Sequence, residues 1–164
     1  MRKNFTEHRF VWLATGMIFG LALAYYWPHE PAYADDAAMG DKFAMCTVNT
    51  LAGNSEAIFV LDFVTGRLLG AAYNTQTGTF TQTYARSVAS DFKVAEDARY
   101  VIVPGQANLR TTGGGPPASG VIYVGELNSG LVSMYGFSYV QSPRQLPVQG
   151  LTLIAQLPWR QASR

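Results

Sequence analysis

The sequence predicts an all-β domain that is preceded by an N-terminal apolar helix. Three observations support this fold class: short apolar runs separated by Gly, Pro and Asn, a hairpin pattern that occurs twice, and an uncharged run near the N-terminus. Only 14% of the residues are charged. A low charge content with many Gly, Thr, Ser, Asn and Gln residues is typical of a β-rich domain. We expect about eight antiparallel strands in two pseudo-repeated four-strand units, with one short helix.

The repeated hairpin occupies residues 57–73 (AIFVLDFVTGRLLGAAY) and 121–137 (VIYVGELNSGLVSMYGF). In each copy an apolar run ends in an acidic residue, and the turn that follows contains a glycine. An acid at this position accepts hydrogen bonds from the backbone N–H groups of the turn, and glycine can adopt the left-handed conformation that closes it. We therefore interpret both pairs as structural residues of the turns. These residues are Asp62, Gly66, Glu126 and Gly130.

The other expected strands flank the two copies of the hairpin. The first unit comprises residues 43–49, 57–63, 67–73 and 79–85, and the second comprises residues 99–105, 121–127, 131–138 and 151–157. Residues 57–63 are apolar on both faces, which predicts a central strand. Ser87 is the expected N-cap of a short helix over residues 87–93. Two arrangements remain open: a compact sandwich or barrel in one chain, which we favour, or a propeller-like combination of several chains.

The N-terminal apolar run covers residues 10–27 and contains no charged side chain. Eighteen residues of helix span about 27 Å, enough for a thin hydrocarbon core. Basic residues precede the run and acidic residues follow it, which predicts a cytoplasmic N-terminus and a domain outside the cytoplasmic membrane. We expect a signal-anchor or signal peptide over residues 1–34, a polar tether over residues 35–42 and the periplasmic β-domain over residues 43–160.

Two fates of this N-terminal segment remain open. Ala32-Tyr33-Ala34 before Asp35 is a cleavage site of the A-x-A type, so the domain could be secreted after cleavage between Ala34 and Asp35. The length of the apolar run favours retention as a single-pass anchor. Gly16 and Gly20 form a GxxxG pattern, through which two such helices could approach closely.

Several classes of activity are excluded by composition. Residues 1–34 hold three of the 12 Lys and Arg and two of the 11 Asp and Glu, so nine of each remain and the domain is neutral. A nucleic-acid-binding domain needs a basic surface. His8 and His29 precede the domain, and Cys46 is its single cysteine. A Ser-His-Asp triad, a Cys-His pair and a histidine-based metal site are therefore not expected, and we predict no catalytic residue, metal or cofactor.

The loop over residues 109–120 (LRTTGGGPPASG) has the most unusual local composition of the chain. It lacks the lysine and the following helix of a phosphate-binding loop, so we expect an exposed surface loop. It is also the place where a partner or ligand contact would be expected. The residues expected to make this contact are Arg110, Gly113, Gly114, Gly115 and Trp159.

These observations favour a non-enzymatic envelope protein whose β-domain binds another envelope protein or a second copy of itself. The alternative is a small-ligand or glycan-binding module that uses exposed aromatic side chains, since aromatic faces bind sugars. Its candidate residues are Tyr135, Phe137, Tyr139 and Trp159. The third hypothesis is a hydrolase that uses two carboxylates. Its candidates are Asp62, Asp91, Asp97 and Glu126.

Four strings carry a resemblance to a known group of proteins: WPHEP, DKFAMCTV, IFVLDFVTG and GVIYVGELNSG. On these strings the chain resembles small uncharacterised membrane-anchored or secreted β-domain proteins of planctomycete bacteria. The resemblance implies an envelope location for the protein. It implies no activity, cofactor or catalytic residue.

Overall fold

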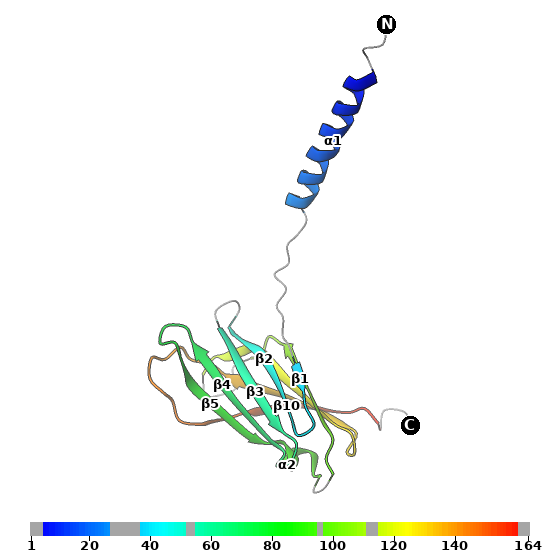
Figure 1. The fold of residues 1–164 in the computed structure, drawn as a ribbon. Coiled ribbons are helices and arrows are strands. Elements are labelled where there is room, and N and C mark those ends of the chain that lie inside the picture. Colours follow the sequence, from blue (N-terminus) through cyan, green and yellow to red (C-terminus); the bar gives the residue numbers. More distant parts are fainter. Residues whose placement is uncertain (1–4, 27–36, 52–54, 95–96, 111–114, 161–164) are drawn as a thin grey trace. The chain divides into compact units, whose positions relative to one another are not determined.

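The structure is a computed structural model, which describes residues 5–26, 37–51, 55–94, 97–110 and 115–160 (Figure 1). The chain divides into two compact units, Met1–Ala34 and Asp35–Arg164. Each unit is described separately.

The N-terminal unit contains helix α1 (Phe5–Tyr26). From Phe10 onward the described side chains of α1 are exposed, and a Cβ added at Gly16 or Gly20 would meet no atom within 4 Å. The apolar run is therefore helical, as expected. Among the described residues, however, no helix combines the length and the apolar character needed to cross a membrane. The membrane-spanning helix expected over residues 10–27 is thus not supported, and Trp27 lies outside the described residues.

The second unit consists of two sheets and helix α2 (Val88–Phe92) (Figure 1). The six-stranded sheet has the order β1-β2-β3-β4-β5-β9, with the strands β1 (Ala37–Met39), β2 (Phe43–Leu51), β3 (Ser55–Asp62), β4 (Arg67–Asn74), β5 (Thr79–Ser87) and β9 (Gln149–Gly150). The four-stranded sheet has the order β10-β8-β7-β6, with the strands β6 (Tyr100–Gln106), β7 (Pro117–Glu126), β8 (Leu131–Ser138) and β10 (Thr152–Pro158). All neighbouring strands are antiparallel except β5 and β9.

The two expected four-strand units correspond to the two sheets. Strands β2, β3, β4 and β5 are neighbours in one sheet, and β6, β7, β8 and β10 are neighbours in the other. Side chains from both sheets form one core, in which the ring centroid of Phe137 lies 5.1 Å from those of Phe59 and Tyr84. The single chain therefore forms a two-sheet sandwich, and the expected all-β class is confirmed for the domain.

Strand β3 lies in the interior of its sheet, and its side chains alternate between the core and the outer face. Ala57, Phe59 and Leu61 are buried, while the residues between them face outward. A Cβ at Gly70 of β4 would lie 2.2 Å from the Phe59 ring, so the ring requires a glycine on the neighbouring strand. On another side of the sandwich, a Cβ at Gly120 would lie 2.4 Å from the carbonyl oxygen of Asn49. The beginning of β7 therefore lies directly against the backbone of β2.

The chain returns to the six-stranded sheet before it forms its last strand. Gln149 and Gly150 pair with Tyr84 and Ala85 of β5, and β10 begins at Thr152 in the other sheet. Only Leu151, which is buried, separates the two strands. The guanidinium of Arg86 donates a hydrogen bond of 2.7 Å to the carbonyl oxygen of Leu151. This crossing joins the two sheets along one side of the sandwich.

Several element boundaries differ from the sequence-based expectation. The expected tether over residues 35–42 contains β1, whose three exposed residues are too few for a recognisable strand pattern. Strand β6 is shifted by one residue from the expected 99–105, and it tolerates Pro104 because it lies at an edge, where a missing N–H costs no ladder hydrogen bond. Strand β7 begins at Pro117, within the expected loop. Ser87 precedes α2, but its side chain makes no capping hydrogen bond.

Candidate functional site

The acidic residue of the first hairpin organises its turn. Asp62 accepts hydrogen bonds from the backbone N–H of Val64 at 2.9 Å and from the hydroxyl of Thr65 at 2.6 Å. These donors, the Thr65 hydroxyl first, lower the pKa of Asp62. Gly66 has a φ of 61° and donates its N–H to the carbonyl oxygen of Asp62. In the structure Asp62 and Gly66 therefore both form part of the turn between β3 and β4.

The second hairpin repeats this design with a longer acid. Glu126 accepts hydrogen bonds from the backbone N–H groups of Asn128 at 2.9 Å, Ser129 at 2.5 Å and Arg99 at 3.1 Å. Burial alone would raise the pKa of Glu126, but these donors outweigh burial and the pKa is lowered. Gly130 has a φ of 66°. The extra reach of glutamate lets this turn also hold the chain just before β6.

A third carboxylate belongs to a polar network between the sheets. Asp91 of α2 forms a bidentate pair with Arg86 at 2.7 and 2.8 Å, and the hydroxyl of Tyr135 donates to it at 2.9 Å. Burial would raise the pKa of Asp91, but the hydrogen bonds from Arg86 and Tyr135 outweigh it and the pKa is lowered. The network links β5, α2 and β8. In the sequence Asp91 is only a hydrolase candidate, because its partner Tyr135 lies 44 positions away.

These contacts bear on the hydrolase hypothesis. Asp62 and Glu126 are bound in turns, and Asp91 is paired with an arginine. Asp97 is exposed and has a φ of 52°. Three of the four candidate carboxylates are thus held by structural hydrogen bonds, which keep them ionised and directed at the protein itself.

The aromatic platform expected for a glycan-binding module is not present. Tyr135, Phe137 and Tyr139 are buried, with exposed fractions of 3% or less. Trp159 is 44% exposed, but it follows the end of β10 that pairs with Leu131. The interpretation of these four residues as one surface was wrong, because three of them alternate into the core.

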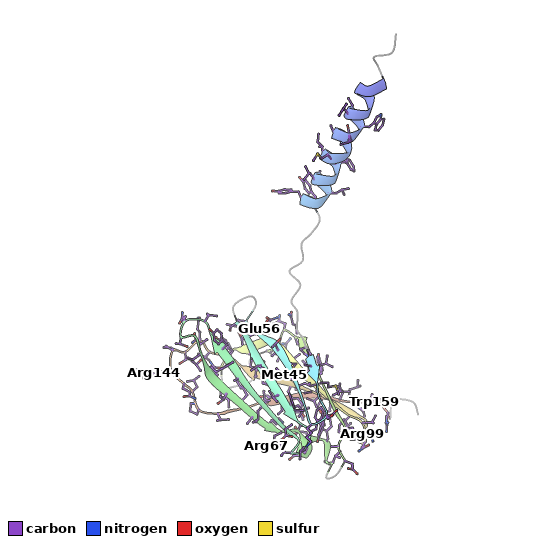
Figure 2. All side chains as sticks on the ribbon, viewed as in Figure 1. Met45, Glu56, Arg67, Arg99, Arg144 and Trp159 are labelled. Atoms are coloured by element: carbon purple, nitrogen blue, oxygen red, sulfur yellow. The ribbon has the colours of Figure 1, made fainter. Side chains whose placement is uncertain are left out.

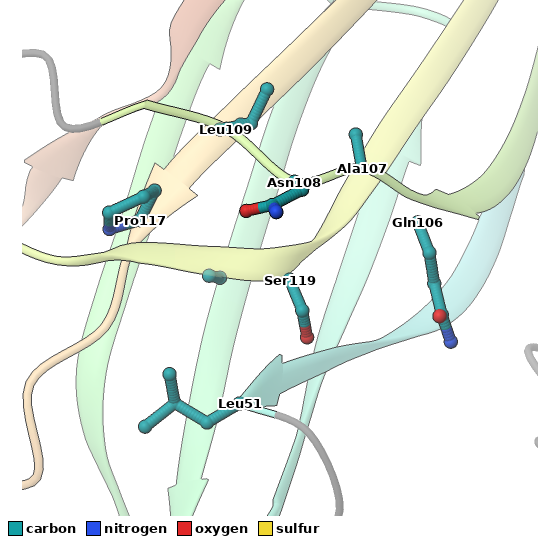
Figure 3. A pocket seen from close by; sticks show the side chains of 8 residues that line it. Leu51, Gln106, Ala107, Asn108, Leu109, Pro117 and Ser119 are labelled. Atoms are coloured by element: carbon teal, nitrogen blue, oxygen red, sulfur yellow. The ribbon is translucent and has the colours of Figure 1, made fainter.

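The glycine-rich loop flanks a pocket of about 360 Å³, lined by both apolar and polar residues, at the ends of β2, β6 and β7 (Figure 3). Figure 3 shows Leu51, Asn108 and Ser119 around this pocket. Within the described ranges the hydroxyl of Ser119 has no hydrogen-bond partner. Gly113 and Gly114 lie outside the described residues, whereas Arg110 is exposed and Gly115 has a φ of 126°. Only some of the expected contact residues therefore lie within the described part of the chain. Trp159 does not line this pocket.

An apolar groove of about 400 Å³ lies on the outer face of the four-stranded sheet. Its floor is Gly125, where a Cβ would lie 2.9 Å from Val101. The side chains that line the groove come from neighbouring strands. Two of these lining residues, Arg99 and Trp159, lie at the same end of the domain (Figure 2). The residues that define this surface, called the Trp159 groove below, are Arg99, Val101, Gly125, Leu127, Val132 and Trp159.

Trp159 is held in place by the residue that follows it. The guanidinium of Arg160 lies 5.0 Å from the centroid of the Trp159 ring. The side chain of Arg160 packs over Gly130, where a Cβ would lie within 2.9 Å of it. The hairpin turn that Glu126 organises therefore also supports the exposed indole.

The apolar character continues along the outer face beyond the groove. Val101, Gly125, Val132 and Leu157 occupy adjacent positions in one row across all four strands. The next row on this face contains Val103, Tyr123, Met134 and Ala155. Neither row contains a charged residue. Contiguous exposed apolar surface of this kind marks sites of interaction in soluble proteins.

Comparison with known proteins adds no relative: no protein-family model, no curated protein and no solved structure matches the chain. The geometry of the domain therefore carries the functional argument.

Proposed function

We propose that this chain is a non-enzymatic, extracytoplasmic recognition protein that binds another envelope protein through the Trp159 groove. The observation that supports the proposal is an exposed indole beside an apolar groove that has a glycine floor. Protein interfaces are enriched in exposed aromatic residues, and tryptophan is among the residues that contribute most to binding energy. Because Gly125 has no side chain, Val101 and Val132 pack closely around it, and together they present an apolar surface to a partner.

The chemistry of the groove favours a protein partner over a small polar ligand. Small-molecule sites are mostly apolar, but they contain a few polar groups that fix the orientation of the ligand. Here Arg99 and Glu126 are the charged residues at the groove, and both carboxylate oxygens of Glu126 already accept hydrogen bonds from the turn and from Arg99. The remaining lining residues are mostly apolar, so an apolar side chain of another protein would pack well against them.

An extracytoplasmic location is part of the proposal and rests on the sequence. Arg2, Lys3 and Arg9 precede the apolar run, and acidic residues follow it. Retention as an anchor and cleavage before Asp35 both place the domain outside the cytoplasm. N-terminal sequencing of the mature protein separates the two routes: a chain beginning at Asp35 indicates cleavage, and an intact N-terminus indicates retention.

Site-specific photo-crosslinking in intact cells tests the groove. A photoreactive phenylalanine analogue replaces Trp159 in one variant and Leu69 in a control variant, because Leu69 is equally exposed on the other sheet. We expect a discrete crosslinked species from position 159 and none from position 69. Adding Val101→Asp should remove this species. Equal crosslinking from both positions, or a species that survives Val101→Asp, would show that the groove is not the binding site.

A further inference from the structure

The edges of the two sheets are protected to very different degrees. An unpaired edge strand can pair with another chain, and proteins prevent this with short strands, proline or charge. Strand β1 has three residues and β9 has two. Strand β6 contains Pro104 and lies close to β2. Strand β10 has seven residues, and no described strand pairs with its outer side.

The sequence of β10 (TLIAQLP) contains no charged residue. Leu157 is 59% exposed and Ile154 is 38% exposed. The register shift between Leu153 and Ala155 distorts the first part of the strand, whereas Ala155 to Pro158 pair regularly with β8. The regular part of β10 is therefore an uncharged, exposed edge that continues directly from the apolar outer face.

We propose that β10 is a self-association edge, at which two copies of this chain pair antiparallel to form one eight-stranded sheet. An antiparallel pair of identical strands is closed by a two-fold axis, so the same surface serves both partners. A strand without charge meets its own copy without like-charge repulsion. Pairing about the middle of the regular part satisfies backbone N–H and C=O groups that otherwise face solvent.

The N-terminal unit independently favours a second copy as the partner. In α1, Gly16 and Gly20 lie one turn apart on one side of the helix, with open space beyond both. This step rests on the proposed retention of the N-terminal segment as an anchor: small residues at this spacing let two identical helices approach closely in a membrane. Two chains held together by such helices would present their β10 edges to each other at a high effective concentration. The Trp159 groove lies on the outer face of the sheet and adjoins β10, because Trp159 directly follows the end of that strand.

A charge-swap experiment on the full chain tests the pairing. Near the two-fold axis the two Ala155 side chains lie opposite or diagonal to each other, about 5 to 8 Å apart. Two differently tagged copies are expressed together and extracted in mild detergent, and the amount of one that co-purifies with the other is measured. We expect Ala155→Lys in both copies, or Ala155→Glu in both, to reduce co-purification by about tenfold. Ala155→Lys in one copy with Ala155→Glu in the other should restore it.

The controls separate this edge from other routes of association. Both copies carry Gly16→Leu and Gly20→Leu, so that α1 does not hold them together. Val103 lies on β6, the other edge strand of the same sheet. Val103→Lys in one copy with Val103→Glu in the other should therefore leave co-purification unchanged. Failure of the wild-type edge to associate in this background, or failure of the mixed pair to recover, would overturn the proposal. If Ala155→Lys instead removes a crosslink from position 159 to a protein other than a second copy of this chain, β10 belongs to that partner's site and the self-pairing is wrong.

Discussion

Substitution of Asp91 by Asn is the sharpest test of how the sandwich is held together. Asp91 accepts two hydrogen bonds from Arg86 and one from Tyr135, and its side chain is 12% exposed. Asparagine has nearly the same shape, but it removes the charge and leaves the Arg86 guanidinium without its counter-ion. Breaking a buried ion pair by removing one partner costs about 3 to 5 kcal/mol. We take the lower end, about 3 kcal/mol, because the Arg86 side chain is 28% exposed and can recruit water.

Urea denaturation of the full chain, followed by tryptophan and tyrosine fluorescence, measures this loss. The double variant with Arg86→Met should lose less stability than the sum of the two single variants, because the second substitution removes the unpaired charge. Asp62→Asn, in an exposed turn, is the matched control and should lower the free energy of unfolding by less than Asp91→Asn does. A loss below about 1 kcal/mol for Asp91→Asn would refute the reasoning, since that is the range of a surface ion pair.

Three further predictions follow from the described contacts. Gly70→Ala should destabilise the domain by about 1 to 3 kcal/mol, because its Cβ would overlap the Phe59 ring, and Phe59→Leu in the same chain should restore part of the loss. Trp159→Ala should leave the urea midpoint nearly unchanged but weaken partner binding by about 2 kcal/mol, or about 30-fold, as measured by titration with the identified partner. Because the pKa of Glu126 is lowered from its ordinary value of 4.5, its contribution to stability should be present above that pH and disappear as the pH falls below it. Glu126→Gln should therefore flatten the acid side of the stability profile; an unchanged profile would contradict this account.

The parts of the fold that sequence reasoning predicted are those specified by neighbouring residues. The turns at Asp62 and Glu126 depend on donors two or three residues away, so their pattern is visible in the sequence. The central position of β3 follows from its apolar residues on both faces. The boundaries were less predictable, because the pairing of β1 and the start of β7 at Pro117 are determined by the neighbouring strand.

The parts that sequence reasoning missed depend on contacts between distant residues. Tyr135 and Asp91 are 44 positions apart, and no local pattern relates them. The floor of the Trp159 groove is a glycine that resembles any other glycine in a strand. Alternation predicts that aromatic residues on one strand share a face, but it does not say which face is buried. Tyr135 and Phe137 were for this reason assigned to a possible surface although they form part of the core.

The crossing at Leu151 has a consequence for the order in which the domain is completed. In a chain that emerges from its N-terminus, the strands β2 to β5 come before residues 149–158. Until those residues arrive, β5 lacks its neighbour β9, β8 lacks its neighbour β10, and Arg86 lacks the carbonyl oxygen of Leu151. The contacts that join the two sheets at this side can therefore form only after residues 149–158 are present. The same segment that completes the core also forms the β10 edge, so the association edge proposed above would exist only once the domain is complete.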